Sequence, residues 1–268
     1  MTVRDKFVKI IRWLASHDLA VLLAVLIVVA GTWGFVALAD RVVEGRSQSF
    51  DEWGIRSLRR HEDVAALIGP GWMADAARNV TVLGGVPFLV CVNLVVAGGF
   101  VVRRKFHALV FALAAVVGGL SVMLLLKEFF ARPRPQVVPY LCAVNGSSFP
   151  SGHSMMSAVV YFTLSVLLAS RIARRPFKLV LLALALLLAG LVGVSRVCLG
   201  VHYPTDVLAG WTAGLVWATF CWLVVRKLKR RTGESTRKKL RGWRTSSEIS
   251  SNFPARRCFI VSRKTSAQ

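Results

Sequence analysis

Six long apolar stretches constrain the fold of this chain more than any other feature of its 268 residues. A helix that crosses the hydrocarbon core of a bilayer needs roughly 20 mostly apolar residues. The stretches run near Leu19 to Ala39, Val80 to Val102, Phe106 to Leu126, Ser154 to Ala169, Phe177 to Val194 and Val207 to Val225. Hydrophobic residues make up 55% of the chain and charged residues only 18%, which is atypical of a soluble domain. We therefore predict an all-α integral membrane protein, a bundle of about six transmembrane helices.

The first apolar stretch has a second interpretation, as a signal peptide. It follows a basic start, and Ala37-Leu38-Ala39 resembles a cleavage site. Its apolar part is longer than a signal core of roughly 7–15 residues, however. The sequence favours a retained helix.

Loop charge predicts which side of the membrane each loop faces, because short loops rich in Lys and Arg stay in the cytoplasm. The N-terminal segment, the loops after the second and fourth stretches, and the tail after the sixth are basic. Six crossings put all four on one side, so both termini are expected in the cytoplasm. The opposite, outer face receives residues 40–78, 127–153 and 195–206. The pattern suits a bacterial inner membrane, whose outer face is the periplasm.

Two polar segments flank the apolar ones. In the segment from Asp40 to Arg78, apolar side chains such as Trp53 and Ile55 lie among charged ones. This composition fits an amphipathic segment on the outer membrane surface and a solvated loop equally well. The net charge of +22 is concentrated in the tail, where residues 226–268 hold 14 Lys or Arg and 2 acidic residues.

The tail lacks helical periodicity, so we predict disorder and contact with anionic lipid headgroups at roughly 1 kcal/mol per basic residue. Nucleic-acid binding is the alternative for such a run, but regularly interleaved aromatic residues are missing, and we predict no nucleic-acid partner. The expected domains are a cytoplasmic N-terminus (1–18), two helices with the outer segment (19–105), a core (106–226) and the tail (227–268).

Three short stretches at the predicted outer face contain the side chains that suit chemistry. They are Lys127 to Pro135, Pro150 to His153, and Ser195 to Asp206. Lys127, Arg134 and Arg196 are cations at membrane borders, where charge is costly and usually functional. Snorkelling to the interface explains each of them alone. Three that converge suit a phosphate dianion and its more highly charged transition state.

The same stretches contain a possible nucleophile and an anion site. Pro204 suits the first turn of a helix, so Asp206 can reach a ring nitrogen of His202, fix its tautomer and make the other nitrogen more nucleophilic. His153 can face His202 across a bound phosphate and protonate the leaving oxygen. A lone histidine is most often structural, but this pair with an acid indicates catalysis. Ser151 and Gly152 precede a helix start, whose free amides bind anions, although simple capping is the default explanation.

Other phosphatase designs do not fit the sequence. No G-x4-G-K-[ST] loop is present, and no cysteine has an arginine six positions later. Near the three stretches, Glu128 and Asp206 are the only carboxylates, fewer than a two-metal site needs. The five cysteines lack a Cys-x2-Cys spacing. Cys142 and Cys198 share the outer face, so both a disulfide and two free thiols stay open.

The three stretches resemble the signature of the type 2 phosphatidic acid phosphatase family, which is K-x6-R-P, then P-S-G-H, then S-R-x5-H-x3-D. All three parts match in full and in order, and the resemblance spans roughly Phe106 to Val225, about half of the chain. The family includes soluble acid phosphatases and vanadium haloperoxidases as well, and the apolar stretches point to its membrane lipid-phosphatase branch. The resemblance implies a phosphatase that works without a metal or other cofactor.

The resemblance also implies roles for individual residues. His202 is the implied nucleophile that forms a phosphohistidine, Asp206 its orienting partner, and His153 the general acid and then base. The implied phosphate cradle is Lys127, Arg134, Ser151, Gly152 and Arg196. Arg132 is an extra cation without an implied role, and contact with a lipid headgroup is its simplest explanation.

We therefore expect an outward-facing phosphatase acting on a membrane lipid. The resemblance implies a polyprenyl diphosphate, phosphatidic acid or phosphatidylglycerol phosphate as the substrate. One alternative is a lipid phosphotransferase, which passes phosphate to an acceptor other than water. Another is a non-enzymatic lipid-binding or transport protein, for which loss of catalytic residues is expected, whereas all are present here. The sequence predicts neither the headgroup nor the oligomeric state.

Overall fold

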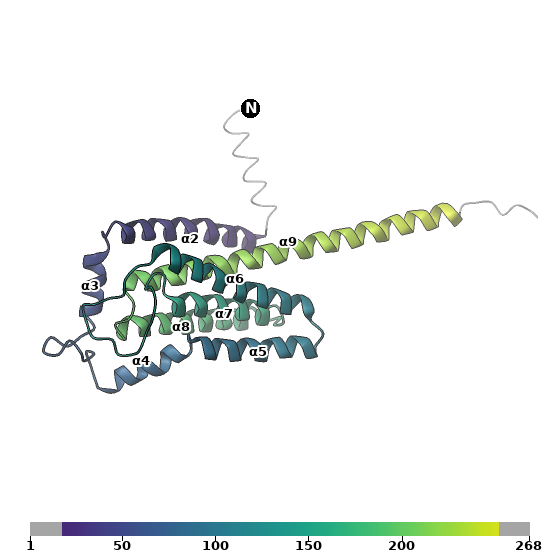
Figure 1. Cartoon of the computed structure of the whole chain (residues 1–268). Coiled ribbons are helices and arrows are strands. Elements are labelled where there is room, and N and C mark those ends of the chain that lie inside the picture. Colours follow the sequence, from purple (N-terminus) through teal and green to yellow (C-terminus); the bar gives the residue numbers. More distant parts are fainter. Residues whose placement is uncertain (1–17, 252–268) are drawn as a thin grey trace, which may run out of the picture. The chain divides into compact units, whose positions relative to one another are not determined.

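A computed structural model describes residues 18–251, with side chains as far as residue 228, and the regular elements in this range are α-helices joined by loops (Figure 1). The chain divides into two units, Met1–Val225 and Arg226–Gln268, which we describe separately. The predicted N-terminal segment 1–18 lies outside the described residues except for Asp18. The helices are α2 (Leu19–Val43), α3 (Gln48–Arg56), α4 (Trp72–Val82), α5 (Val86–Val102), α6 (Phe106–Phe130), α7 (Gly152–Ala169), α8 (Arg175–Cys198) and α9 (Pro204–Ser251).

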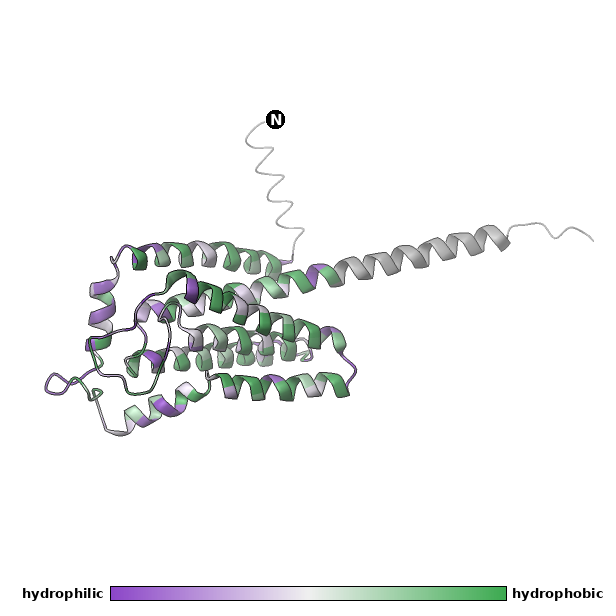
Figure 2. Ribbon diagram, in the orientation of Figure 1, coloured by the Kyte–Doolittle hydropathy of each residue, from purple (hydrophilic) through white to green (hydrophobic). Residues whose placement is uncertain are grey.

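The number of membrane-spanning helices confirms the prediction from the apolar stretches. Among the described residues, five helices are long and apolar enough to cross a bilayer: α2, α6, α7, α8 and the part of α9 up to Leu228. Helices α4 and α5 form a sixth crossing if the bent pair is one span. Figure 2 shows these helices as mainly apolar along their length, with more polar residues in α3 and in the segments near it. The protein is therefore an all-α membrane bundle.

The second span differs from the single helix predicted over residues 80–102. Helix α4 ends at Val82, α5 begins at Val86, and the two are bent by 43°. Pro87 in the first turn of α5 lacks an amide donor, so the helix cannot run through it unbroken. Gly84 lies at this break, and a Cβ atom added there would be 2.3 Å from Val192 Cγ1 and 3.4 Å from His153 Cβ. A glycine is needed here because α7 and α8 both pack closely against the break.

Helix α7 forms the centre of the bundle. More than half of its span is buried, against 6–28% for the other four unbroken spans. Glycines let α9 approach it: a Cβ at Gly210 of α9 would be 2.7 Å from the Ser151 carbonyl oxygen, and one at Gly214 would be 2.5 Å from the Met155 carbonyl oxygen. Close backbone approach at small residues is typical of membrane helices. The start of α7 is thus held rigidly among α6, α8 and α9.

The segment from Asp40 to Arg78 contains a short amphipathic helix, and its contact with the outer membrane surface stays a prediction. Helix α3 lies across one end of the bundle (Figure 1). Asp51 and Ile55 on its inner face are fully buried, whereas Trp53 on its outer face is 65% exposed. The sequence did not predict that a carboxylate, Asp51, would be among the buried residues.

The second unit begins within α9. The sequence predicted a disordered tail after residue 226. The backbone of α9 is instead helical as far as Ser251. Because the preceding span is already helical, no new helix has to be nucleated, and each further residue only adds one backbone hydrogen bond to the existing helix. The Lys and Arg residues that fill this stretch are also good helix formers. The assignment of residues 227–268 to contact with lipid headgroups stays a prediction.

Candidate active site

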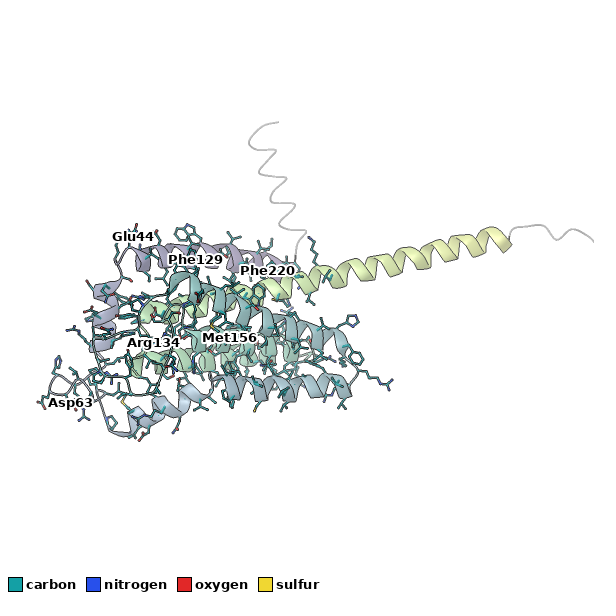
Figure 3. All side chains as sticks on the ribbon, viewed as in Figure 1. Glu44, Asp63, Phe129, Arg134, Met156 and Phe220 are labelled. Carbon is teal, nitrogen blue, oxygen red and sulfur yellow. The ribbon has the colours of Figure 1, made fainter. Side chains whose placement is uncertain are left out.

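The three predicted stretches meet at the end of the bundle where α3 lies. Lys127 is in the last turn of α6, Gly152 and His153 begin α7, and Arg196 is in the last turn of α8. The connection from α8 to α9 reverses direction at Gly200, which has a φ of 74°, a left-handed conformation that glycine adopts readily. Figure 3 shows Arg134 at this same end.

His202 and Asp206 face one another in the buried turn that leads into α9. Both side chains are almost completely buried. His202 Nδ1 lies 3.6 Å from Asp206 Oδ2, slightly beyond hydrogen-bond distance, and it has no other partner among the described residues. The other ring nitrogen, Nε2, is 3.4 Å from Arg134 Nη1. One ring nitrogen therefore faces a carboxylate, and the other nitrogen faces a cation.

Burial governs the ionisation of His202. It lowers the pKa of the imidazole from 6.5 to about 4, although the Asp206 carboxylate raises it and Arg196 and Arg134 lower it further. His202 is therefore neutral near pH 7. A neutral ring with its proton on Nδ1, toward Asp206, presents the lone pair of Nε2 for nucleophilic attack.

Backbone carbonyl groups hold two of the three predicted cations in place. Arg134 donates hydrogen bonds to the carbonyls of Gly146 (2.9 Å), Asn145 (2.8 Å) and Val201 (2.9 Å). Lys127 Nζ donates to the Ser147 carbonyl at 2.5 Å. These contacts fix the positions of the cations without neutralising their charge.

The third cation, Arg196, is only 3% exposed. Its Nη1 donates to Thr81 Oγ1 at 3.1 Å, and its Nε has no partner. In the part of the chain that the structure describes, neither Arg196 nor Lys127 nor Arg134 forms an ion pair with a carboxylate. Buried charge without a counter-charge is costly, so the site has a deficit of negative charge that an anion would correct.

The N-terminus of α7 adds further donors next to Lys127. Ser151 is the N-cap residue but its side chain does not cap the helix, and the amides of Gly152 and His153 have no acceptor among the described residues. A Cβ on Gly152 would be 3.5 Å from Lys127 Cε, so the small residue lets the lysine lie against the helix start. Ser151 N donates to the Asp206 carbonyl at 2.9 Å, which ties this helix start to α9.

His153 completes the set of predicted residues. It is half-buried in the first turn of α7, beside the α4–α5 break. The charges of Arg196, His202, Arg134 and Lys127 all act on its ring. The structure thus brings together all eight of the predicted residues: His202, His153, Asp206, Lys127, Arg134, Ser151, Gly152 and Arg196.

Sequence reasoning missed Arg132 and Asp51. Arg132 does not reach out to a headgroup: it is buried, with Nη1 2.7 Å from Asp206 Oδ1 and Nη2 2.8 Å from Asp51 Oδ2. The two carboxylates raise its pKa, although burial lowers it. The only signal in the sequence was the position of Asp51, four residues before Ile55 and therefore on the apolar face of a short amphipathic helix.

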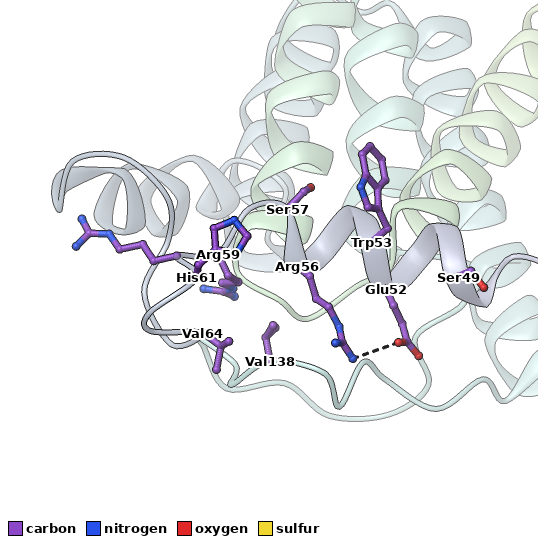
Figure 4. A pocket seen from close by; sticks show the side chains of 10 residues that line it. Ser49, Glu52, Trp53, Arg56, Ser57, Arg59, His61, Val64 and Val138 are labelled. Atoms are coloured by element: carbon purple, nitrogen blue, oxygen red, sulfur yellow. Dashed lines mark hydrogen bonds and ion pairs between the residues drawn. The ribbon is translucent and has the colours of Figure 1, made fainter.

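A separate groove lies on the outer side of α3 (Figure 4) and has a volume of about 790 Å³. None of the eight predicted residues lines it; the lining is Ser49, Glu52, Trp53, Arg56, Ser57, Arg59, Arg60, His61, Val64 and Val138. The Glu52–Arg56 ion pair crosses its wall. This groove has no nucleophile with an orienting acid, so the chemistry belongs to the His202 site.

The four cysteines among the described residues form no disulfide. Cys91, Cys142, Cys198 and Cys221 are all free. Cys142 Sγ lies 3.9 Å from Arg196 Nη1. The pairing of Cys142 with Cys198, left open by the sequence, does not occur.

Comparisons with known proteins show which family this chain is similar to. Residues 107–230 match the model of the PAP2 superfamily. Phosphatidylglycerophosphatase B of Bacillus subtilis is 35% identical over 189 residues, which cover 68% of this chain and 86% of the relative. Lipid phosphate phosphatase 2 of Arabidopsis thaliana is 45% identical over 83 residues, 28% of each chain. The crystal structure of a transmembrane PAP2-type phosphatidylglycerolphosphate phosphatase from Bacillus subtilis superposes with a TM-score of 0.65 and 30% identity, covering 77% of this chain and 97% of that one.

Proposed function

The chain belongs to the PAP2 superfamily and is a membrane lipid phosphatase, and from this premise we propose that it hydrolyses a lipid phosphate or diphosphate through a phosphohistidine at His202, without a metal ion. One observation carries the proposal: the neutral, buried His202 has Asp206 at one ring nitrogen and Arg134 at the other. The nitrogen that faces the cations is the one that a bound phosphate would meet.

The first half of the reaction uses the two histidines on opposite sides of phosphorus. The lone pair of His202 Nε2 forms a bond to phosphorus while the bond from phosphorus to the lipid oxygen breaks. Protonated His153 gives its proton to that oxygen, so the lipid leaves as an alcohol or, from a diphosphate, as a monophosphate. Asp206 stabilises the positive charge that develops on the imidazole.

The second half reverses these roles. Water attacks phosphorus, His153 takes its proton, the phosphorus–nitrogen bond breaks, and inorganic phosphate leaves. In both steps Lys127, Arg134 and Arg196, with the amides at the start of α7, stabilise the charge on the phosphoryl oxygens.

The location of the site supports an outward-facing enzyme. The basic loops after α5 and α7 connect the helix ends opposite to those that carry the site (Figure 1), and basic loops stay cytoplasmic. We therefore propose that the site faces the periplasm of a bacterial inner membrane, that both termini are cytoplasmic, and that residues 106–226 form the phosphatase core. Relatives named as phosphatidylglycerophosphatases support phosphatidylglycerol phosphate as the first substrate to test.

The decisive experiment measures phosphate release by the purified protein in detergent with excess chelator. The substrates are phosphatidylglycerol phosphate, phosphatidic acid and a polyprenyl diphosphate. We expect the wild type to release inorganic phosphate in the presence of the chelator, and the His202→Ala variant to release none. His107→Ala is the matched control, because His107 is an exposed histidine at the other end of α6, and it should retain full activity.

A rapid-quench experiment with labelled phosphate tests the intermediate. Phosphohistidine is labile to acid and stable to alkali, so we expect protein-bound label with this behaviour, absent in His202→Ala and accumulating in His153→Ala. Release that requires a metal, or that persists in His202→Ala, would overturn the mechanism. Transfer of label to an added alcohol in preference to water would instead identify a phosphotransferase.

A further inference from the structure

A buried ionic network extends from the predicted site into α3. The Arg132 guanidinium bridges two carboxylates, Asp206 on α9 and Asp51 on α3, at 2.7 and 2.8 Å. Both carboxylates are completely buried, and the arginine side chain is only 10% exposed. Asp51 and Arg132 lie outside the eight predicted residues. A buried charge triad of this kind costs desolvation energy, so its position beside the nucleophile calls for a reason.

Both carboxylate oxygens of Asp51 accept hydrogen bonds. Its Oδ1 accepts from the Thr205 amide at 3.0 Å, and its Oδ2 accepts from Thr205 Oγ1 at 2.7 Å and from Ser47 Oγ at 3.2 Å. The helix itself fits closely against the start of α9, because a Cβ on Gly54 would be 2.6 Å from Pro204 Cγ. Asp51 therefore holds Thr205, the residue directly before Asp206, through two hydrogen bonds.

The network divides the two oxygens of Asp206 between different partners. Oδ1 receives the Arg132 hydrogen bond, while Oδ2 accepts from the Tyr203 amide at 2.9 Å and faces His202 Nδ1. Arg132 also stacks over the Tyr203 ring, 4.3 Å from its centroid. With two carboxylates for one guanidinium, a net negative charge remains beside the imidazole. If Asp51 were neutral, Arg132 would cancel the charge of Asp206.

We propose that Asp51 and Arg132 are positioning residues of the active site: Arg132 holds Asp206 ionised and oriented toward His202, and Asp51 fixes Arg132 and Thr205 in place. By this inference α3, although outside the signature, is part of the catalytic apparatus. The inference rests on the proposed function, because its effect is measured on phosphate release. In metal sites, mutation of the partners that orient the direct ligands typically changes activity by about 10- to 100-fold, and we expect an effect of the same order here.

The inference predicts opposite shifts in the pH dependence of kcat/KM. The charged groups around His202 are Asp206 on α9, Arg134 on the segment after α6, Arg196 on α8 and His153 on α7. Loss of the Asp51 charge lets Arg132 act more strongly on this set, which lowers the pKa of His202 and moves the acid limb to lower pH. Loss of the Arg132 charge leaves both carboxylates uncompensated and moves the acid limb to higher pH.

The test compares four variants with the wild type by kcat, KM and pH profile on the fastest lipid substrate. Asp51→Asn should lose about tenfold in kcat with little change in KM, and Asp51→Glu, which keeps the charge, should restore the position of the acid limb. Arg132→Gln should shift that limb the other way. Glu52→Gln is the matched control on the same helix, since Glu52 forms its ion pair with Arg56 on the surface, and it should behave as the wild type.

The outcomes separate this inference from the proposed function. If the wild type releases no phosphate, the proposed function fails before the variants are compared. If the wild type is active and the folded Asp51→Asn and Arg132→Gln variants keep its kcat and acid limb, or shift the limb in the same direction, the positioning role is refuted. If Arg132→Gln does not fold, Asp51→Asn and its rescue by Asp51→Glu decide the matter alone.

Discussion

The burial of His202 makes the stability of this protein depend on pH in a calculable way. The pKa of His202 falls from 6.5 to about 4 on folding, because burial disfavours the charged ring. At pH 8 the residue is neutral in both states. Below about pH 6.5 the unfolded chain binds a proton that the folded chain does not, so the free energy of unfolding decreases as the pH falls from 6.5 toward 4. At roughly 1.4 kcal/mol per pH unit, the loss is about 2 kcal/mol by pH 5.

Thermal unfolding in detergent at pH 8 and pH 5 measures this loss. His202→Gln is the reference, because glutamine does not titrate and all other ionisable groups are common to both proteins. For a protein of this size, about 2 kcal/mol corresponds to about 4–8 °C. The melting temperature of the wild type should therefore fall by that much more than the melting temperature of the variant. Equal decreases in the two proteins would show that His202 is not buried in its neutral form.

Three further predictions follow from individual contacts. Gly193→Ala places a Cβ 2.3 Å from the Trp211 ring and should lower the free energy of unfolding, measured by thermal unfolding, by about 1–3 kcal/mol. Gly190→Ala is the control on the same helix: it has open space around it, so the substitution should be neutral or slightly stabilising. Tyr161→Phe removes the 2.7 Å hydrogen bond to the carbonyl at the α4–α5 break and should cost about 1 kcal/mol in the same assay. Arg134→Lys keeps the charge but loses the fork that binds three carbonyls, so kcat/KM for phosphate release should fall at least about tenfold. An unchanged kcat/KM would remove Arg134 from the phosphate site.

The spans were predictable from the sequence because a bilayer imposes a length on every apolar helix. The break between α4 and α5 was not recognised, since Gly84 and Gly85 are compatible with a membrane helix and the hydropathy of the stretch continues across them. What breaks the helix is Pro87, together with the close approach of α7 and α8. That approach is a property of the packed bundle and leaves no local pattern in the chain.

The closer two residues of the site lie along the chain, the more readily their contact could be predicted. His202 and Asp206 are four positions apart at a helix start, so turn geometry alone brings them together. The convergence of three separate stretches needed the alternation of outer and inner loops. Asp51 and Arg132 are 81 positions apart, and their contact depends on how α3 lies across the bundle. An amphipathic helix can bury a carboxylate only where a particular cation meets it, and the sequence does not say which cation that is.

Arg132 also explains how a carboxylate can coexist with the unpaired cations of the site. The charge of Asp206 acts on Lys127 and Arg134, and an ion pair with either would remove the positive charge that a phosphate needs. Because Arg132 occupies Oδ1 and the Tyr203 amide occupies Oδ2, Asp206 is kept turned toward His202 and away from those cations. The same bridge that orients the nucleophile therefore preserves the anion site, so a variant without Arg132 should lose phosphate affinity as well as the orientation of His202.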